Sequence, residues 1–281
     1  MTNFQENMIK KIKNNQQYSA EDYYKDGVLY CHKCNTEKEY ITPKGNKIPC
    51  LCECRVKELK EEEEKIKKQD FIRNNKRHIE KEYRDIYLKD IDFLEEEYFF
   101  AEKFIDEFEK FQKMKLGLYI FGEVGNGKTT IASAIANELL EKQYKVLMMP
   151  SNIAISKINS GDGNNQDNIN HFKQTLIDMD CIILDDFGAT RETAYQLEKI
   201  YNLINFLYES RKVVVITSNI TRKDLGNEED LAKKRIFDRI IQMTYGCLIK
   251  RQGVRKDIAK ENQKNVNEIF KRSVKNETFK N

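Results

Sequence analysis

One octapeptide constrains this chain more than any other feature. Residues Gly122 to Thr129 read GEVGNGKT and fit the pattern G-x-x-x-x-G-K-[ST]. An apolar run from Leu116 to Phe121 comes directly before it, and a helical pattern from about Lys128 to Lys142 follows. Between a strand and a helix, such a peptide forms a loop whose backbone N–H groups and helix N-terminus hold phosphate groups. The placement therefore predicts a phosphate-binding loop rather than a plain glycine-rich turn.

The residues of this loop have separate expected roles. Lys128 would reach the β- and γ-phosphates of a nucleotide, and the Thr129 hydroxyl would bind Mg²⁺. The glycines let consecutive backbone N–H groups turn inward on the phosphates. The predicted nucleotide-binding residues of the loop are Gly122, Glu123, Val124, Gly125, Asn126, Gly127, Lys128, Thr129 and Thr130.

Apolar strands alternate with helical patterns along the rest of the body. Strands are expected at 145–149, 181–184 and 213–217, with helices at about 168–178 and 194–210. This order predicts an α/β fold with a buried, mostly parallel central sheet and helices on both faces. The polar stretch 159–170 is expected to be an exposed loop. An amphipathic helix before the first strand would bury Phe99, Phe100, Phe104, Ile105, Phe108 and Phe111.

Two later strands end in polar side chains that suit phosphate chemistry. The strand 181–184 runs into Asp185 and Asp186, and the strand near 213–217 is followed by Asn219. Asp185 would hold Mg²⁺ through water, and Asp186 is positioned to orient an attacking water as a general base. Asn219 would hydrogen-bond the γ-phosphate or that water. The plainer alternative is that the two acids only cap the turn after their strand.

The phosphate-binding loop, the acid pair and the polar end of the strand near 213–217 occur in this order. In this respect the body resembles the AAA+ ATPases of the bacterial and phage replicative helicase loader group (DnaC/DnaI type), which also includes the transposition helper IstB. The resemblance covers about residues 116–255. It is carried by GLYIFGEVGNGKTTIASAIANELLEKQYKVLMM, then IILDDFGATRET, then LINFLYESRKVVVITSNITRKDL, and by the intervals between them. It implies a P-loop NTPase that binds ATP with Mg²⁺ and hydrolyses it where subunits meet.

The resemblance also assigns arginines. Arg239 matches the interface arginine that a neighbouring subunit donates to the transferred phosphoryl group, with Arg235 as the close alternative. Arg255 matches the group's second nucleotide-sensing arginine. The acid pair Asp185-Asp186 departs from the Asp-Glu of most AAA+ proteins. Because the second carboxylate is one methylene shorter, we expect slow basal hydrolysis, more a switch than a motor.

Five of the seven cysteines lie close together near the N-terminus, as C-x2-C at 31–34 and C-x-C-x-C at 50–54. In a reducing cytosol this spacing indicates metal ligation rather than disulfides, and four thiolates suffice for tetrahedral Zn²⁺. An iron–sulfur cluster is a minor alternative, and His32 is expected to be a bystander. The resemblance favours Cys31, Cys34, Cys52 and Cys54 as the zinc ligands, with Cys50 as the alternative to Cys52.

The predicted organisation has four parts. Residues 1–54 form the zinc-binding module, 55–92 a charged helical linker, 93–255 the AAA+ ATPase domain and 256–281 a basic tail. The net charge of only +3 excludes a strongly basic nucleic-acid packaging protein. No apolar run approaches the length of about 18 residues that a membrane helix needs, and no signal peptide is evident. We therefore expect a cytoplasmic protein without a membrane partner.

The leading functional hypothesis from the resemblance is an ATP-dependent helicase loader in DNA replication initiation. It would self-associate through the AAA+ domain, bind single-stranded DNA and hold a hexameric DnaB-type helicase through the zinc module. The alternative is an IstB-like transposition helper that acts on duplex target DNA. A third hypothesis, a zinc adaptor with a vestigial nucleotide site, is disfavoured by the intact Lys128, Thr129 and Asp185.

Overall fold

The computed structural model describes residues 19–91, 95–159, 166–188 and 193–250, together with 263, 264 and 266. The chain divides into two compact units, Met1–Phe71 and Ile72–Asn281. The two units are considered separately below. The domain boundaries expected at residues 54, 92 and 255 remain predictions.

Two short antiparallel hairpins build the first unit. Asp26 and Gly27 join the strands of the first hairpin with φ of 51° and 78°, the positive values that a two-residue type I′ turn requires. The hairpins bring the two ends of the cysteine-rich segment together. Their strands are β1 (Tyr23–Lys25) with β2 (Val28–Tyr30), and β3 (Glu39–Ile41) with β4 (Lys47–Pro49).

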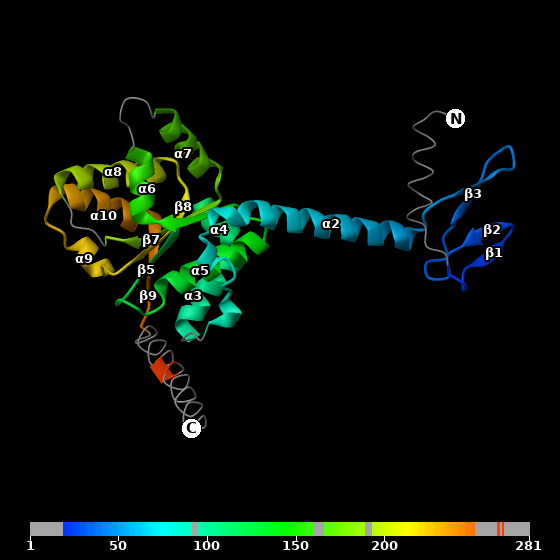
Figure 1. Ribbon diagram of the computed structural model, residues 1–281, viewed down its shortest axis with the longest axis horizontal. Helices are drawn as coiled ribbons and strands as arrows, with labels where there is room; N and C mark the ends of the chain where they lie inside the picture. The colour runs from blue at the N-terminus through cyan, green and yellow to red at the C-terminus, as the bar shows by residue number, and fades with distance from the viewer. Residues whose placement is uncertain are drawn as a thin grey trace, which may run out of the picture. The chain divides into compact units, whose positions relative to one another are not determined.

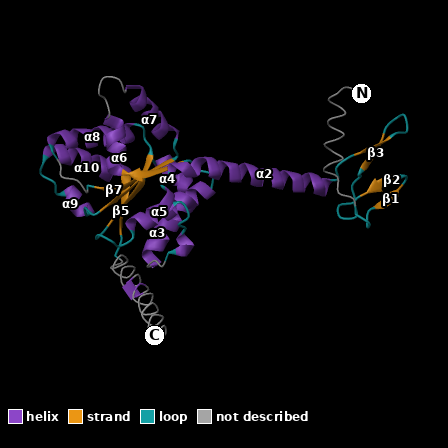
Figure 2. Ribbon diagram, viewed as in Figure 1, coloured by secondary structure: helices purple, strands orange, loops and turns teal. Residues whose placement is uncertain are grey.

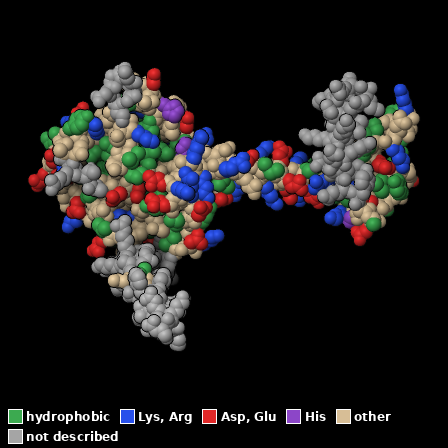
Figure 3. Space-filling view, in the orientation of Figure 1, with side chains coloured by type: hydrophobic (Ala, Val, Ile, Leu, Met, Phe, Trp, Pro, Cys, Tyr) green, Lys and Arg blue, Asp and Glu red, His purple; other side chains and the backbone are tan. Residues whose placement is uncertain are grey.

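The long helix α2 (Glu53–Asn75) confirms the helix expected from the charged segment after Arg55 and extends it. None of its 23 side chains is buried. Charges of both signs cover it, as Figure 3 shows, and include the i,i+4 pair Glu63–Lys67 at 2.8 Å. Among the described residues, no helix combines the length and the apolar character that crossing a membrane requires.

A five-stranded parallel sheet forms the centre of the second unit, with helices on both of its faces (Figure 2). The order β6-β7-β8-β5-β9 places the strand before the phosphate-binding loop between two others. The expected central parallel sheet is therefore present. The strands are β5 (Gly117–Phe121), β6 (Val146–Pro150), β7 (Cys181–Phe187), β8 (Val213–Ser218) and β9 (Thr244–Leu248).

Helices lie on both faces of the sheet (Figure 1). Successive side chains of a strand point to opposite faces and so meet different helical layers. Leu147, Ile182 and Val214 join the large core cluster beneath α6, α7, α8 and α10. Met148 faces the other layer, where the Ser133 hydroxyl of α5 contacts its sulfur at 3.7 Å. The helices of the two layers are α6 (Ser151–Asn159), α7 (Gln166–Asp178), α8 (Ala194–Glu209) and α10 (Leu231–Met243), then α3 (Glu95–Asp106) and α5 (Lys128–Glu141).

Two expectations need correction, and three elements were missed. The phenylalanine-rich segment forms two helices, because Glu107 leaves helical geometry (φ −101°, ψ 21°) between α3 and α4 (Phe108–Met114). The loop expected over 159–170 is wrong at 159, the last residue of α6, and at 166–170, where α7 has already begun; 160–165 lie outside the described residues. The sequence analysis also did not find α6, α9 (Arg222–Gly226) or β9.

The segment before α3 packs against the body through short turns. Ile79 and Leu88 are buried there. The amide of Asn137, on α5, donates to the carbonyls of Tyr83 at 2.7 Å and Ile86 at 2.9 Å, which fixes the path of this segment. The turns are η1 (Lys76–His78), η2 (Lys81–Tyr83) and η3 (Leu88–Asp90).

Candidate active site and candidate metal centre

A cavity of about 540 Å³ lies at the carboxyl ends of the parallel strands. This is the edge of an open α/β sheet where ligands usually bind. The phosphate-binding loop, the ends of β6, β7 and β8, and Tyr83 from η2 line it. Most of the predicted loop residues, the acid pair and Asn219 therefore meet at one cavity. The predicted loop residues that are not among those lining it are Gly122, Glu123 and Asn126.

Glycines give the loop its turn. Gly125 and Gly127 have φ of 82° and 90°, in the left-handed region that glycine tolerates best. Gly122 has φ 153°, and a Cβ there would lie 2.3 Å from the Asn126 amide nitrogen and 2.5 Å from the Ile249 carbonyl oxygen. The first glycine of the motif is therefore required by packing as well as by backbone geometry.

Lys128 begins α5 and is buried at its first turn. Its ammonium donates to the carbonyl oxygens of Gly122 at 3.0 Å and Glu123 at 2.8 Å, and to Asn126 Oδ1 at 3.2 Å. These acceptors hold a positive charge against the loop, beside the cavity. A phosphate group entering the cavity would meet this charge together with the N-terminus of α5.

The two predicted Mg²⁺ ligands contact each other. The Thr129 hydroxyl donates to both carboxylate oxygens of Asp185, at 3.0 and 3.1 Å. The Thr217 hydroxyl, from the end of β8, donates to the same carboxylate at 2.5 Å. Hydroxyl and carboxylate oxygens are the donors that Mg²⁺ prefers, and the two lie together only because β5 and β7 end at one edge of the sheet. The residues present therefore fit Mg²⁺.

Asp186 and Asn219 stand at the tips of adjacent strands. Asp186 has a left-handed backbone (φ 52°), fixed by a bond from its N–H to the Thr217 hydroxyl at 2.8 Å and one from the Ser151 hydroxyl to its carbonyl at 3.1 Å. Its exposed carboxylate accepts from the Asn219 amide at 3.5 Å. Both side chains line the cavity, so a water between them and a phosphate would be within reach of a base and an amide.

The sequence analysis missed Tyr83 as a residue of this site. Its ring lines the cavity, and its pKa is raised by burial and then by the negative charges of Glu82 and Asp185. The apolar spacing of its segment indicated only packing. What places it here is the long-range hydrogen bond from Asn137, which no local pattern reveals.

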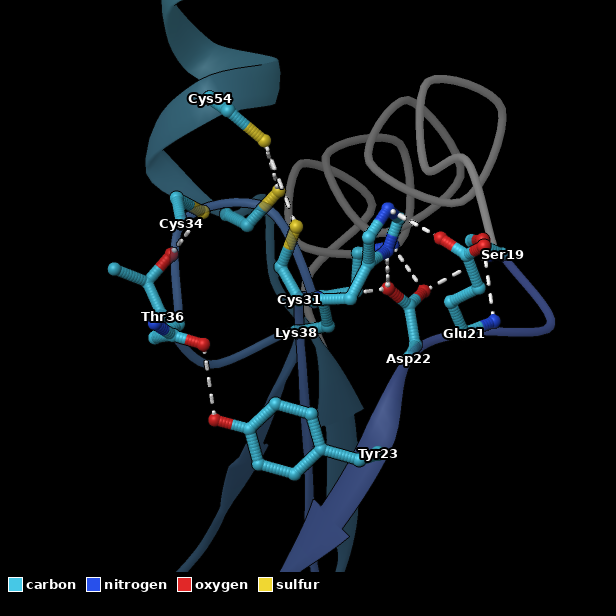
Figure 4. A network of polar contacts seen from close by, with 12 residues as sticks. Ser19, Glu21, Asp22, Tyr23, Cys31, Cys34, Thr36, Lys38 and Cys54 are labelled. Atoms are coloured by element: carbon cyan, nitrogen blue, oxygen red, sulfur yellow. Dashed lines mark hydrogen bonds and ion pairs between the residues drawn. The ribbon is translucent and has the colours of Figure 1, made fainter.

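Four of the five clustered cysteines converge on one point in the first unit (Figure 4). The sulfur atoms of Cys31, Cys34, Cys52 and Cys54 all lie within 4.8 Å of one another. Two of the pairs, Cys31–Cys54 and Cys52–Cys54, are 3.5 and 3.3 Å apart. Tetrahedral zinc with Zn–S bonds of about 2.3 Å requires sulfur atoms roughly 3.8 Å apart. The cluster therefore fits Zn²⁺ and is the set that the resemblance implied, while the Cys50 thiol donates to the Glu37 carbonyl at 3.4 Å.

Thr36 connects the two halves of this cluster. Its hydroxyl contacts the Cys34 sulfur at 3.0 Å and accepts from the backbone N–H of Glu53, at the start of α2, at 3.0 Å. Burial alone would raise the pKa of Cys34, but its hydrogen bonds with Thr36 and Cys54 lower it to about 6. Burial and contacts with neighbouring thiols raise the pKa of Cys54. Four adjacent thiols cannot all ionise without a cation among them.

A buried carboxylate lies next to the cluster, at the start of β1 (Figure 4). The Asp22 side chain is only 2% exposed and accepts from Lys38 Nζ at 2.5 Å and from the backbone N–H groups of Ser19 at 2.9 Å and His32 at 3.2 Å. The His32 ring also contacts Asp22, at 3.0 Å. Asp22, Cys31 and His32 form a second group with ligand atoms within 4.8 Å, but these bonds already occupy Asp22.

The sequence of the body is similar to those of known bacterial ATPases. Residues 112–241 match the family described as the bacterial DnaA ATPase domain. The chain is 27% identical over 139 residues to the replicative helicase loader DnaI of Bacillus subtilis (strain 168), which covers 45% of this chain and 43% of that protein. It is 25% identical over 145 residues to the phage-like element PBSX protein XkdC of the same strain. This match covers 49% of the present chain and 53% of XkdC. The chain thus spans about half the length of these curated relatives.

Solved structures show the same fold. A crystal structure of DnaI covers 61% of this chain with a TM-score of 0.52 at 24% identity, and one of the DnaC helicase loader covers 61% with 0.51 at 21%. The match takes in 95% of the DnaI chain and 100% of the DnaC chain. The body is therefore similar to the bacterial DnaA ATPase domain and to the helicase loader DnaI, and it shares the fold of the DnaI and DnaC structures.

In this body, Arg239 lies on α10 and is not among the described residues that line the cavity. Its guanidinium donates to the Tyr201 hydroxyl at 3.1 Å and to the Arg235 carbonyl at 3.2 Å. It also stacks on the rings of Tyr201 and Tyr208 of α8, 4.7 and 5.7 Å from their centroids. Arg235 is exposed one turn earlier, and Arg255 lies outside the described residues.

Proposed function

We propose that this protein is an ATP-dependent helicase loader that acts in DNA replication initiation. One observation carries the proposal: in a domain of the DnaC/DnaI group, the loop lysine, the Thr129 hydroxyl and the Asp185 carboxylate meet at one cavity. These are the three groups that bind phosphates and Mg²⁺ in P-loop NTPases. A relative at 27% identity is named a replicative helicase loader, which supports the choice of partner.

ATP binding would use groups that already face the cavity. The backbone N–H groups of the loop would bind the phosphates, and the Lys128 ammonium would exchange loop carbonyls for the β- and γ-phosphate oxygens. Bound Mg²⁺ would neutralise charge on the phosphates. Thr129 and Asp185 would hold that ion, Asp185 through water. Thr217 donates to Asp185 and fixes the direction of its carboxylate.

Hydrolysis would then need a water oriented from the opposite side of the cavity. We infer that Asp186 accepts its proton and that the Asn219 amide orients it or the γ-phosphate. Arg239 of a neighbouring copy would complete the site, with Arg235 as the alternative. Because Asp186 is shorter than the Glu of most AAA+ proteins and the arginine comes from another chain, turnover by the isolated protein is expected to be slow.

The cysteine module would hold Zn²⁺ through Cys31, Cys34, Cys52 and Cys54 and would bind the hexameric DnaB-type helicase. The thiol cluster supports the metal, and the resemblance to the loader group supports the partner. Single-stranded DNA and self-association through the AAA+ domain complete the proposed set of interactions. An IstB-like transposition helper would share the nucleotide site but would act on duplex DNA.

The direct test is capture of the cognate replicative helicase by the full-length protein, with and without ATP and Mg²⁺. We expect a complex that Cys52→Ser abolishes and that Cys50→Ser, outside the thiol cluster, leaves intact. Binding of single-stranded DNA should exceed binding of duplex. Failure to capture the helicase under any nucleotide condition, with duplex DNA preferred, would contradict the loader and support the transposition helper.

A further inference from the structure

A hydrogen-bonded path runs from the loop lysine to the last strand of the sheet through one buried side chain. Asn126 is only 2% exposed. Its Oδ1 accepts from Lys128 Nζ at 3.2 Å, and its Nδ2 donates to the carbonyl of Ile249 at 2.8 Å. A single amide group therefore joins the phosphate-binding lysine to the chain just beyond β9.

The far end of this path is anchored in two other elements. The Ile249 N–H donates to the Phe121 carbonyl at 2.8 Å and continues the parallel pairing of β9 with β5. The Lys250 N–H donates to Glu97 Oε1 at 2.8 Å, and Glu97 is only 3% exposed on α3. Residues 249 and 250 are thus held by the loop, the sheet and a helix at once.

The loop leaves space for this path at Gly122. A Cβ on Gly122 would lie 2.3 Å from Asn126 Nδ2 and 2.5 Å from the Ile249 oxygen, the two atoms that form the hydrogen bond. Only a glycine at this position allows the Asn126 side chain to cross beneath the loop. The contact is therefore built into the packing of the motif and is not an accident of a surface rotamer.

We propose that Asn126 is a positioning residue that makes the end of β9 respond to nucleotide. The inference rests on the proposed binding of ATP at the loop. In the arrangement described, the Lys128 ammonium polarises the Asn126 amide, and a donor in such a chain forms a stronger bond to its acceptor. When phosphate oxygens take the ammonium, Asn126 Oδ1 loses its charged donor and the bond to Ile249 weakens. Residues 249 and 250 are then held less tightly.

Amide hydrogen exchange of the full-length protein tests this directly, with and without a non-hydrolysable ATP analogue and Mg²⁺. Exchange at Ile249 and Lys250 is expected to rise about two- to fivefold on binding, the size of a modest change in one hydrogen bond. Amides of α5 and β8 should exchange at the same rate or more slowly. This opposite sign separates the proposed effect from the general tightening that a bound ligand causes.

Asn126→Ala removes the relay and Asn137→Ala is its matched control. Asn137 is also a buried asparagine of the same region, but its amide donates to Tyr83 and Ile86 instead. In Asn126→Ala, exchange at residues 249 and 250 should be fast and the same with and without nucleotide. In Asn137→Ala, the nucleotide response at these two residues should persist.

The outcomes separate this inference from the proposed function. If the analogue binds to the wild-type protein while exchange at 249 and 250 is unchanged or slower, the relay is wrong and nucleotide binding stands. If Asn126→Ala keeps the wild-type response, Asn126 plays only a structural part and the inference also fails. If the analogue does not bind at all, the proposed ATPase function fails first, and the relay fails with it.

Discussion

The two units of this chain are held together in different ways. In the α/β body, β8 is buried along its whole length and most of β7 is buried as well, between two layers of helices. In the cysteine module, the buried apolar side chains among the described residues are Leu29, Cys31 and Cys52. Apolar burial of about 25 cal/mol per Å² can stabilise the body. The module has too little of it, so a metal ion bound by its thiols would have to supply most of the rest.

The comparison shows where function can be separated from stability. The polar site residues of the body lie at the edge of the sheet and are not part of its apolar core cluster, so substitutions of Asp186 or Asn219 should change activity more than folding. In the module, the candidate metal ligands are themselves the core. Loss of a ligand there should remove the fold and any docking role together.

Removal of zinc should have the largest effect and should be confined to the module. Structural zinc sites contribute about 10–16 kcal/mol in small domains. A strong chelator should therefore make residues 19–54 susceptible to protease, whereas the α/β body keeps its thermal transition. Mass spectrometry of the cleavage products, together with a zinc assay, measures this. Cys50→Ser should behave like the wild type, and equal protection with and without metal would show that the module folds by apolar packing alone.

Asp186→Asn should have the next largest effect and should act on chemistry alone. Loss of a general base lowers a rate by about 10²- to 10⁴-fold. Single-turnover hydrolysis of ATP is expected to fall by this amount, while the thermal transition of the body stays the same because the side chain is exposed. Asp178→Asn, an exposed acid at the end of α7, is the control. Undiminished hydrolysis in Asp186→Asn would remove Asp186 from the mechanism.

Asp22→Asn tests the buried ion pair of the module. The substitution leaves the Lys38 ammonium buried without its carboxylate, which costs about 3–5 kcal/mol. Zinc release in a denaturant series should follow this loss. Glu21→Gln removes an acid that contacts the His32 ring but is 75% exposed, so it should cost under about 1 kcal/mol. Similar effects of the two substitutions would contradict a role for burial.

The same pair predicts a pH dependence. Burial raises the pKa of Asp22, but the hydrogen bonds from Lys38, Ser19 and His32 outweigh it and hold the pKa well below its ordinary range. A depressed carboxyl pKa stabilises the fold above the unfolded value of about 3.9. This stabilisation should persist through neutral pH and be lost only as the pH falls below about 4. Asp22→Asn should flatten this part of the stability profile.

Tyr201→Phe should have the smallest effect. It removes the 3.1 Å bond to the Arg239 guanidinium but keeps the stacked ring. If Arg239 completes a neighbour's site, ATP hydrolysis should be measured over a series of protein concentrations. At concentrations where the wild type is most active, the variant should be only about two- to fivefold slower, the contribution of one hydrogen bond. Tyr208→Phe keeps the ring and removes a hydroxyl that does not contact Arg239 in the structure, so it should match the wild type.

Local patterns predicted the elements that carry the nucleotide site. The strand before the loop, the helix after it and the strands ending at Asp185 and Thr217 were found within a few residues of their observed bounds. Each is a buried apolar run or a strong helical pattern beside a turn, which is what sequence periodicity detects. The cysteine spacing likewise predicted a metal centre, and the cluster gathers the four favoured thiols.

The missed features depend on contacts between distant residues. β9 contains Gly246 and exposes Tyr245 and Leu248, so it lacks the continuous buried apolar run that marked the other strands of the sheet, and it pairs with β5 only in the fold. Tyr83 reaches the cavity because of Asn137, more than fifty positions later. The Asn126 side chain contacts the carbonyl of Ile249, which lies 123 positions later in the sequence. Such contacts are fixed by the tertiary fold and leave no periodic signal.

Calorimetric titration of the wild-type protein and Lys128→Ala with ATP and Mg²⁺ tests the central claim most directly. The Lys128 ammonium supplies the one side-chain positive charge of the loop, so the wild type should bind ATP and the variant should bind it about 100-fold more weakly or not at all. Circular dichroism of the variant confirms that the body is folded. Equal affinity in the two proteins, or no binding by the wild type, would contradict the account.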